Sequence, residues 1–336
     1  MKKYIKENKF YLLTILIVIL LFNIRLPYYI NTPGGTININ DRIEYKNLKK
    51  YDGSLNMLYV TEYVATIPTY LMSYIIKEWD VEEISANQIS DETPEEIDTR
   101  NKIMLDNSIH NAIYVAYNAA NCKIEIKNKR NLVIGTTTKN GLEIGDELLE
   151  LEGEPIENVE MIKQTISQKE IGDNLTFLLK RDGKEQEVTV KIQEIEETKG
   201  IGVVIITDYD YEIDPQIELK FKKSESGSSG GLMMALSIYS AISEKDILKG
   251  RNIAGTGTID MNGNVGKIDG IKYKIMGAVK DNMDIVLVPS DNYQEAKKIV
   301  KEKNYDIEIV EVKTFEDAIN YLEKYIFKRK RIFLRM

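Results

Sequence analysis

Residues 225–239 read Glu-Ser-Gly-Ser-Ser-Gly-Gly-Leu-Met-Met-Ala-Leu-Ser-Ile-Tyr, and this stretch decides the fold of the C-terminal third. Its first half, residues 227–231, is a glycine-rich turn, and its second half is an apolar run that predicts a buried helix. A serine where such a turn enters a helix lies beside backbone N–H groups that have no partner within the helix and that favour negative charge. Ser229 is therefore a candidate nucleophile, supported by the flexible turn residues Gly227 and Gly230.

The choice of a general base is narrow, because the chain contains one histidine, His110, far upstream of the serine. The Gly-x-Ser-x-Gly pattern at 227–231 also fits the nucleophile elbow of α/β-hydrolases, but that fold needs a histidine after the serine, and none follows. A Cys122–His110 pair lacks the glycine context, so a helix-surface histidine and a packed cysteine are the better interpretations. The base is therefore expected to be a lysine, because burial can lower the pKa of an ammonium group by several units.

Three segments follow the glycine turn in a specific order. They are the strand-like Ile253-Ala-Gly-Thr-Gly-Thr-Ile259, the lysine-bearing Gly270-Ile-Lys-Tyr-Lys274 and the apolar Asp284-Ile-Val-Leu-Val-Pro-Ser290, which predicts a buried strand. This order resembles the proteolytic domain of Lon-type peptidases. It resembles in particular the membrane-anchored, ATPase-free Lon-like proteins with a PDZ domain that are found in Gram-positive bacteria. The resemblance covers residues 200 to about 325.

The resemblance assigns roles residue by residue. It implies that the nucleophile is Ser229, that the lysine of a Ser–Lys dyad is Lys274, and that Thr256 supports the dyad. Lys272, two positions earlier, is the close competitor of Lys274. The chain departs from the family at two positions, with Ser228 where the family usually has proline and Gly230 where it usually has alanine.

Residues 121–195 have a different character, with short alternating strands. Asp182-Gly183 predicts a tight hairpin turn, and the stretch from Gly141 through Ile156, followed by a helical segment, resembles a PDZ domain. Such domains bind an extended peptide along a strand edge and hold its terminal carboxylate with backbone N–H groups. The nearest candidate for the carboxylate loop is Leu132-Val-Ile-Gly135. The alternative is a β-rich spacer that binds no peptide.

The N-terminus suggests a membrane segment. Four lysines precede an uncharged apolar run from Phe10 to Ile24, which Arg25 closes. We expect a cytoplasmic tail at 1–9, a transmembrane anchor at 10–27 and the remaining chain outside the cell, according to the positive-inside rule. A cleaved signal peptide is the alternative, although no small-x-small cleavage site follows the run. Residues 28–120 are expected to form a connector and the first part of the outside region, with a strand at 55–65 and helices at 67–79 and 101–118.

Composition excludes several classes. The 336 residues suffice for two folded modules, and a net charge of −8 without a basic stripe argues against nucleic acid as a partner. Cys122 is alone, so no intrachain disulfide is expected. No cofactor, metal or nucleotide is expected, because the segment around Lys267 fails the phosphate-loop pattern, with Met261 in place of the first glycine.

Taken together, the sequence predicts an α+β chain with an N-terminal anchor, a PDZ-like domain at 121–195, a Lon-type Ser–Lys proteolytic domain at 196–326 and a basic tail at 327–336. The predicted function is that of a membrane-tethered, ATP-independent serine endopeptidase. It would cleave extracellular peptides or exposed protein segments that the PDZ-like domain selects or gates. The alternative is a catalytically inactive PDZ-type peptide-binding adaptor at the membrane.

Overall fold

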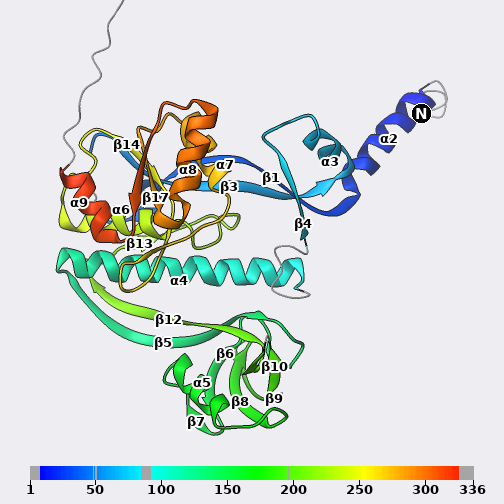
Figure 1. Ribbon diagram of the computed structural model, residues 1–336, viewed down its shortest axis with the longest axis vertical. Helices are drawn as coiled ribbons and strands as arrows, with labels where there is room; N and C mark the ends of the chain where they lie inside the picture. The colour runs from blue at the N-terminus through cyan, green and yellow to red at the C-terminus, as the bar shows by residue number, and fades with distance from the viewer. Residues whose placement is uncertain (1–7, 48, 50, 85–91, 196, 325–336) are drawn as a thin grey trace, which may run out of the picture.

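The computed structural model of the protein describes residues 8–47, 49, 51–84, 92–195 and 197–324. Within them, two sheets lie on either side of one long helix, α4 (Pro94–Ala120) (Figure 1). The helix is longer than the predicted 101–118, because a capping box of Thr93 and Glu96 starts it about two turns earlier.

The first sheet has the strand order β18-β17-β14-β3-β1-β4. The bounds of its strands are β18 (Glu308–Val312), β17 (Ile285–Pro289), β14 (Asn252–Gly255), β3 (Ser54–Thr66), β1 (Arg25–Asn38) and β4 (Asp80–Glu83). Strands β3, β14, β17 and β18 run parallel, and β1 runs antiparallel to β3 and to β4. The predicted buried strand at 284–290 is confirmed, since every residue of β17 is buried, as expected of a parallel strand covered on both faces.

Helices cover both faces of the first sheet (Figure 1). Helices α6 (Gly231–Ser243), α4 and α9 (Phe315–Lys324) share a core with one face, and α7 (Ile271–Lys280) and α8 (Ser290–Lys303) share a core with the other. The alternation along a strand sets this division, because Met57 of β3 packs with α6 whereas its neighbour Leu58 packs with α7. The helices α6 and α7 therefore lie on opposite faces of the same strands.

The second sheet is antiparallel, with the order β12-β5-β6-β8-β9 and a short strand β7 beside β6. The bounds of its elements are β5 (Lys123–Thr136), β6 (Glu147–Leu151), β7 (Glu154–Pro155), β8 (Asn174–Arg181), β9 (Lys184–Lys191) and β12 (Val203–Asp214), with helix α5 (Val159–Ser167) packed on it. It has its own core around Val133, Leu151 and Phe177. The predicted Asp182-Gly183 turn is confirmed, because both residues have positive φ and join the paired strands β8 and β9.

Strands β5 and β12 join the two halves of the molecule. They pair along their whole length, from Lys123 opposite Asp214 to Thr136 opposite Val203. At one end they lie against α4, and at the other they form part of the second sheet (Figure 1). Short elements complete the described chain: η1 (Ile39–Asp41), β2 (Ile43–Glu44), α3 (Ile67–Ser73), β10 (Gln193–Ile195), β11 (Thr198–Gly200), β13 (Glu218–Leu219), β15 (Thr258–Ile259) and β16 (Val265–Gly266).

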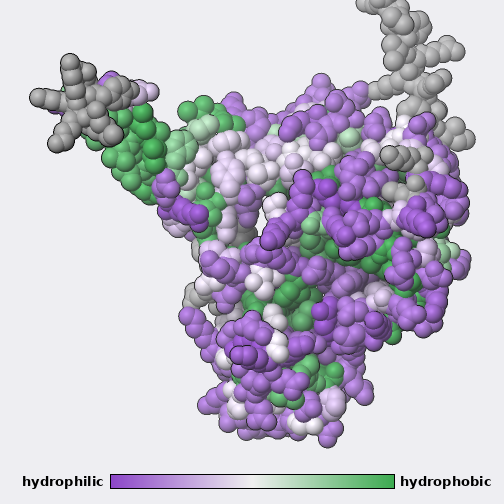
Figure 2. Space-filling model, turned by 180° about the vertical axis from the view of Figure 1, so that it is seen from behind, coloured by the Kyte–Doolittle hydropathy of each residue, from purple (hydrophilic) through white to green (hydrophobic). Residues whose placement is uncertain are grey.

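The N-terminal helix corrects the predicted anchor. Helix α2 (Lys9–Asn23) has 15 residues, and its side chains form an exposed apolar surface at one end of the molecule (Figure 2). At 1.5 Å per residue it extends about 22 Å, against a hydrocarbon core of about 30 Å. In the described part of the chain, no helix is both long enough and apolar enough to span a membrane. The transmembrane anchor at 10–27 is therefore wrong, as is the single-pass localisation with an extracellular catalytic domain that depended on it.

The segment predicted as a connector begins with a sheet strand. Pro33-Gly34-Gly35 suggests a turn, yet these residues lie inside β1. The glycines serve close packing: a Cβ on Gly34 would lie 2.2 Å from the Tyr59 carbonyl oxygen, and one on Gly277 of α7 would lie 3.0 Å from the Gly35 Cα. The strand predicted at 55–65 is confirmed as β3. The tails predicted at 1–9 and 327–336 lie outside the described residues, apart from residues 8 and 9.

Candidate active site

The nucleophile turn, residues 227–231, leads directly into α6. Gly230 is the N-cap of this helix and Gly231 its first residue, and the helix has no side-chain cap. The turn is fixed from two sides. The Ser229 carbonyl accepts hydrogen bonds from the Gly257 N–H at 2.7 Å and from Oγ1 of Thr256 at 3.0 Å. The carbonyl of the preceding residue, Ser228, accepts from Oγ of Ser108 and from the Gly231 N–H.

Fixing these two carbonyls also fixes two N–H groups. In a trans peptide unit the carbonyl and the next N–H point in opposite directions, so the N–H groups of Ser229 and Gly230 point away from Thr256 and Ser108. Within the described residues, neither of these two N–H groups donates a hydrogen bond to the protein. The start of α6 therefore presents two fixed donors, beside a partly buried serine, to a group of negative charge.

Gly227 supports the turn through its backbone conformation. Its φ of +89° lies in the left-handed region that glycine adopts without strain. Its N–H donates to the Asn101 carbonyl of α4 at 3.0 Å. Gly230 is needed for space instead, because a Cβ there would lie 2.8 Å from Sδ of Met57. Glycine at position 230 therefore leaves room for the methionine on the neighbouring strand β3.

Lys274 lies in the first turn of α7 and is 4% exposed. Its helix begins after Gly270, which has a φ of +68°, sits close to Val60 of β3 and provides no side-chain cap. Burial lowers the pKa of the Lys274 ammonium group from 10.5 to about 8, although the negative charge of Asp269 acts in the opposite direction. A substantial fraction of this amine is therefore neutral near pH 7 to 8.

The competing lysine has a different environment. The ammonium group of Lys272 donates to Oδ2 of Asp80 on β4 at 2.5 Å, and its side chain is 35% exposed. The hydroxyl of Tyr273 donates to the same carboxylate. The ion pair with Asp80 therefore keeps the ammonium group of Lys272 at the surface. Two lysines that lie two positions apart on α7 thus differ: Lys272 forms a surface ion pair, whereas Lys274 is buried.

The topology brings the starts of α6 and α7 to one edge of the first sheet. Strand β14 ends at Gly255, and the next two residues, Thr256 and Gly257, hold the Ser229 carbonyl. Helix α7 leads back to the beginning of the parallel strand β17, so its first turn, with Lys274, lies at the carboxyl end of β14. Because the two helices cover opposite faces, their N-termini flank this strand end, which is where open α/β sheets bind ligands.

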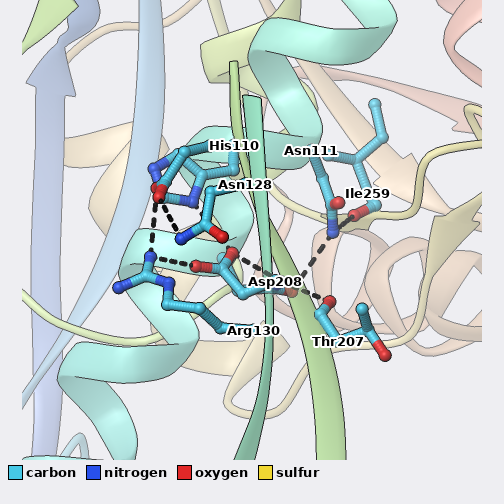
Figure 3. Close-up of polar contacts among 9 residues, drawn as sticks. His110, Asn111, Asn128, Arg130, Thr207, Asp208 and Ile259 are labelled. Carbon is cyan, nitrogen blue, oxygen red and sulfur yellow. Dashed lines mark hydrogen bonds and ion pairs between the residues drawn. The ribbon is translucent and has the colours of Figure 1, made fainter. Parts of the chain in front are cut away.

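His110 belongs to a separate polar cluster between α4 and the paired strands β5 and β12 (Figure 3). Its Nδ1 lies 2.8 Å from Oδ1 of Asp208, and Nη2 of Arg130 donates to the other oxygen of that carboxylate at 2.7 Å. Burial alone would raise the pKa of Asp208, but the hydrogen bonds from His110 and Asn107 and the charge of Arg130 lower it below its ordinary value. His110 is thus a half-buried partner of Asp208 rather than a free helix-surface side chain.

The same cluster is the one grouping of metal-ligand types found among the described residues. Atoms of His110, Asp208 and Asp210 lie within 4.8 Å of one another. Arg130 already donates to both carboxylates, so a guanidinium group supplies the positive charge there. Cys122 lies beyond the end of α4, 12 residues from His110 and therefore about 18 Å along the helix axis. Burial and Asp214 raise the pKa of its thiol, as expected of a packed cysteine.

The predicted carboxylate loop at 132–135 is instead part of a strand. These residues lie in β5 and pair with β12, Leu132 opposite Ile206 and Gly135 opposite Val204, so their backbone groups are engaged. Strand β12 stands at the end of the sheet order, and no described strand pairs with its outer edge. The chain enters this edge strand through Gly200-Ile201-Gly202, in which Gly202 has a φ of +66°. In the sequence, Gly200 and Gly202 directly before the apolar start of β12 were the pattern from which this edge strand could have been predicted.

Sequence reasoning also missed the polar residues of α4 that contact the site. Ser108, 3% exposed, holds the nucleophile turn, and the Asn111 amide donates to the Ile259 carbonyl of β15 at 3.1 Å. These two polar residues are three positions apart on a helix whose buried residues are mostly apolar. Polar residues within the apolar face of a helix could have indicated that this face also holds a neighbouring loop by hydrogen bonds.

Comparison with known proteins finds one match in the C-terminal part of the chain and one in the second sheet. Residues 222–324 match the family model of the Lon protease (S16) C-terminal proteolytic domain, and residues 133–192 match the PDZ domain model. The Lon protease of Campylobacter jejuni is 35% identical over 98 residues, 29% of this chain and 12% of that protein. The Lon protease of Mesomycoplasma hyopneumoniae is 34% identical over 100 residues, 30% of this chain and 11% of that protein.

Among solved structures, the PDZ domain of the SdrC-like protein from Listeria monocytogenes matches with 20% identity and a TM-score of 0.23, covering 24% of this chain and 93% of that one. The predicted resemblance to Lon-type peptidases with a PDZ domain is confirmed by the family models. The narrower assignment to Gram-positive Lon-like proteins stays a prediction, without the membrane anchor that the structure contradicts. The chain spans about an eighth of the length of the curated relatives it matches.

Proposed function

We propose that the chain is an ATP-independent serine endopeptidase in which Ser229 is the nucleophile, Lys274 the general base and Thr256 a supporting residue. The observation that carries the proposal is the buried amine of Lys274, whose pKa is lowered to about 8, in a helix that starts at the strand end where the Ser229 turn is held. The match of residues 222–324 to a Lon-type proteolytic domain supports the peptidase activity.

The proposed chemistry follows from these groups. Neutral Lys274 takes the hydroxyl proton of Ser229 while the serine oxygen attacks the substrate carbonyl carbon. The N–H groups of Ser229 and Gly230 stabilise the resulting oxyanion, an effect that is worth about 2.7–4 kcal/mol for one such donor in another serine peptidase. The protonated lysine then gives its proton to the leaving amine as the peptide C–N bond breaks. Water hydrolyses the acyl-enzyme with the same lysine as base.

We further propose that the second sheet selects or gates the substrate at the outer edge of β12. An extended peptide can add to an unpaired strand edge through backbone hydrogen bonds, and the match of residues 133–192 to the PDZ model supports this role. The proposed substrates are extended peptides or unstructured protein segments, because a strand edge pairs with an extended backbone. The proposed division of the chain is a PDZ-like unit at 121–195 followed by the proteolytic unit at 196–326.

Mass spectrometry of a peptide library incubated with the full chain tests the proposal. The wild-type chain is expected to cleave, Ser229→Ala to lose cleavage by several orders of magnitude, and Ser228→Ala, the matched control one residue earlier, to keep most of it. Cleavage that survives Ser229→Ala but not Ser228→Ala would place the nucleophile one position earlier. A wild-type chain that binds peptides without cleaving any would make it a peptide-binding adaptor instead.

A further inference from the structure

Helix α4 holds strand β12 of the second sheet through a group of polar contacts. The side-chain amide of Asn107 donates to the Thr207 carbonyl at 3.2 Å and to the Asp208 carboxylate at 3.0 Å. His110, one turn further along the helix, contacts the same carboxylate at 2.8 Å. Asp208 is 1% exposed, so its charge is stabilised by these partners and Arg130 rather than by water. Strand β12 is therefore tied to α4 at a defined register.

The same stretch of α4 holds the candidate active site on a neighbouring face. Ser108 donates to the Ser228 carbonyl, and Asn111 donates to the Ile259 carbonyl. Ile259 ends β15, which directly follows Thr256 and Gly257, the two residues that hold the Ser229 carbonyl. A shift of α4 would therefore displace both the Ser108 contact with the nucleophile turn and the segment 256–259 that holds the Ser229 carbonyl.

One hydrogen bond joins the two groups of contacts. The Asn111 amide also donates to Oδ1 of Asn107 at 3.2 Å. Each asparagine has two amide hydrogens, and in both residues the two hydrogens have partners. The orientation of both amides is thereby determined. The result is an unbroken chain of contacts from Asp208 through Asn107 and Asn111 to Ile259, part of which is visible in Figure 3.

The chain of contacts begins beside the edge proposed to bind peptide. Val203 and Ile205, at the start of β12, pack against the core of the second sheet, and Thr207 and Asp208 follow them along the strand. An extended peptide that pairs with this edge orders the strand immediately before the residues that Asn107 holds. Binding at the edge and the position of the α4 side chains are thus separated by one or two residues of the same strand.

We propose that Asn107 and Asn111 are positioning residues that connect the second sheet to the nucleophile turn, so that an extended peptide bound along β12 alters turnover at Ser229. The inference rests on the proposed function for its effect on turnover. Its structural part, that the state of β12 and the order of the nucleophile turn are coupled through these two amides, is independent of catalysis.

Hydrogen exchange on the full chain tests the coupling. Asn111→Ala removes the central link, and Asn118→Ala is the matched control, since Asn118 is an exposed asparagine of the same helix whose side-chain amide donates to the Tyr114 carbonyl of that helix. We expect exchange at residues 227–231 and 256–259 to become about tenfold faster in Asn111→Ala, with no change in the control or in β17, because the opening is local. The value of kcat should fall about tenfold while KM changes less, as expected for a misplaced reacting group.

A double-mutant comparison separates one connected chain from two independent supports. Combining Asp208→Asn with Asn111→Ala should reduce kcat no further than the stronger single variant does, because both changes break the same chain; Asn107→Ala replaces Asp208→Asn if that variant does not fold. Exchange at 227–231 that is unchanged in Asn111→Ala, or effects of the two changes that simply multiply, would overturn the proposal. If the wild-type chain cleaves no peptide, the proposed function fails, while the exchange experiment still decides the coupling.

Discussion

Helices α4 and α5 begin in one way, and α6 and α7 begin in another. The side chain of Thr93 caps α4, and that of Asn158 caps α5 by accepting from the Met161 N–H at 2.9 Å. Helices α6 and α7 start after Gly230 and Gly270, with no side-chain cap. A side-chain cap typically contributes about 1 kcal/mol. The two helices at the candidate active site forgo this contribution, and among the described residues the N–H groups of Ser229 and Gly230, just before α6, have no protein acceptor.

Helices α6 and α7 also differ from each other. A serine and two glycines, residues 229–231, lead into α6, and they pack so closely that a Cβ on Gly231 would lie 2.8 Å from both Oγ of Ser108 and Cγ2 of Ile259. The first turn of α7 contains the long side chain of Lys274 in a buried setting. One turn therefore presents backbone donors and the other an amine, and the predictions below test whether each is needed.

The largest expected effect separates the two lysines of α7. Lys274→Ala should lower kcat by about 100-fold to 10,000-fold, the usual range for a general base. Lys272→Ala removes a surface ion pair with Asp80 and should change stability by less than about 1 kcal/mol and kcat little. Steady-state kinetics on one peptide substrate compares them. The reverse result would move the base to Lys272 and would contradict the assignment by burial.

The pH dependence of the reaction follows from the same amine. Because only neutral Lys274 accepts a proton, kcat/KM should rise about tenfold per pH unit below about 8 and level off above it, in line with the lowered pKa. Initial rates at constant ionic strength between pH 5.5 and 9.5 provide the measurement. A profile that is flat from pH 6 to 9 would show that the rate does not depend on this ionisation.

Burial of the amine should also be visible in stability. The folded pKa of about 8 lies below the unfolded 10.5, so burying the ammonium form opposes folding by about 3 kcal/mol below pH 8. This opposition fades as pH rises from 8 to 10.5. Lys274→Met should therefore stabilise the chain by up to about 3 kcal/mol at pH 7 and by much less at pH 10.5, measured by urea unfolding. Lys272→Met is the control and should show no such pH dependence.

The two glycines at the start of α6 should differ in their response to an added methyl group. Gly231→Ala meets Ser108, Ile259 and backbone, and should destabilise the chain by about 3 kcal/mol, near the upper end of overpacking costs. Gly230→Ala meets only the flexible side chain of Met57, and should cost about 1 kcal/mol. Thermal unfolding of both variants checks the order. Equal losses would mean that the turn relaxes freely, contrary to its hydrogen bonds.

The smallest effect concerns the capped helices themselves. Thr93→Ala and Asn158→Ala should each lower stability by about 1 kcal/mol and leave kcat unchanged once the protein is folded, because both caps lie away from the nucleophile turn. Urea unfolding and kinetics on the same samples give both quantities. A large loss of kcat in either variant would show that the contrast between the two kinds of helix start is not confined to the active-site edge.

Local patterns in the sequence predicted much of this molecule. The Asp182-Gly183 turn, the strand β17 and the apolar helix after Ser229 each depend on neighbouring residues, and each forms as expected. Predictions from the sequence were wrong where a residue's structural partner lies far away in the chain. Gly34 and Gly35 suggested a turn because their reason, the closeness of α7 some 240 residues later, is invisible locally. The α2 run suggested an anchor because its end at Asn23 depends on β1 pairing with β3.

In the candidate site, too, some residues could be predicted from local motifs and others could not. Ser229, Lys274 and Thr256 could be named from motifs in a known order, and the contact of Thr256 with the Ser229 carbonyl agrees with that order. Asn107 and Asn111 could not be named, because a polar residue on a helix says nothing about its partner until the strands β12 and β15 are placed against it. The burial that lowers the pKa of Lys274 likewise depends on packing that no single motif encodes.

The pairing of β5 with β12 has a consequence for how the chain is put together. Because Lys123 faces Asp214, the stretch between them leaves and re-enters the body at almost the same place. Domain insertions are tolerated at such points, where the ends of the inserted segment are adjacent. The second sheet is therefore built as an insertion whose two ends lie close enough for a short loop to join them.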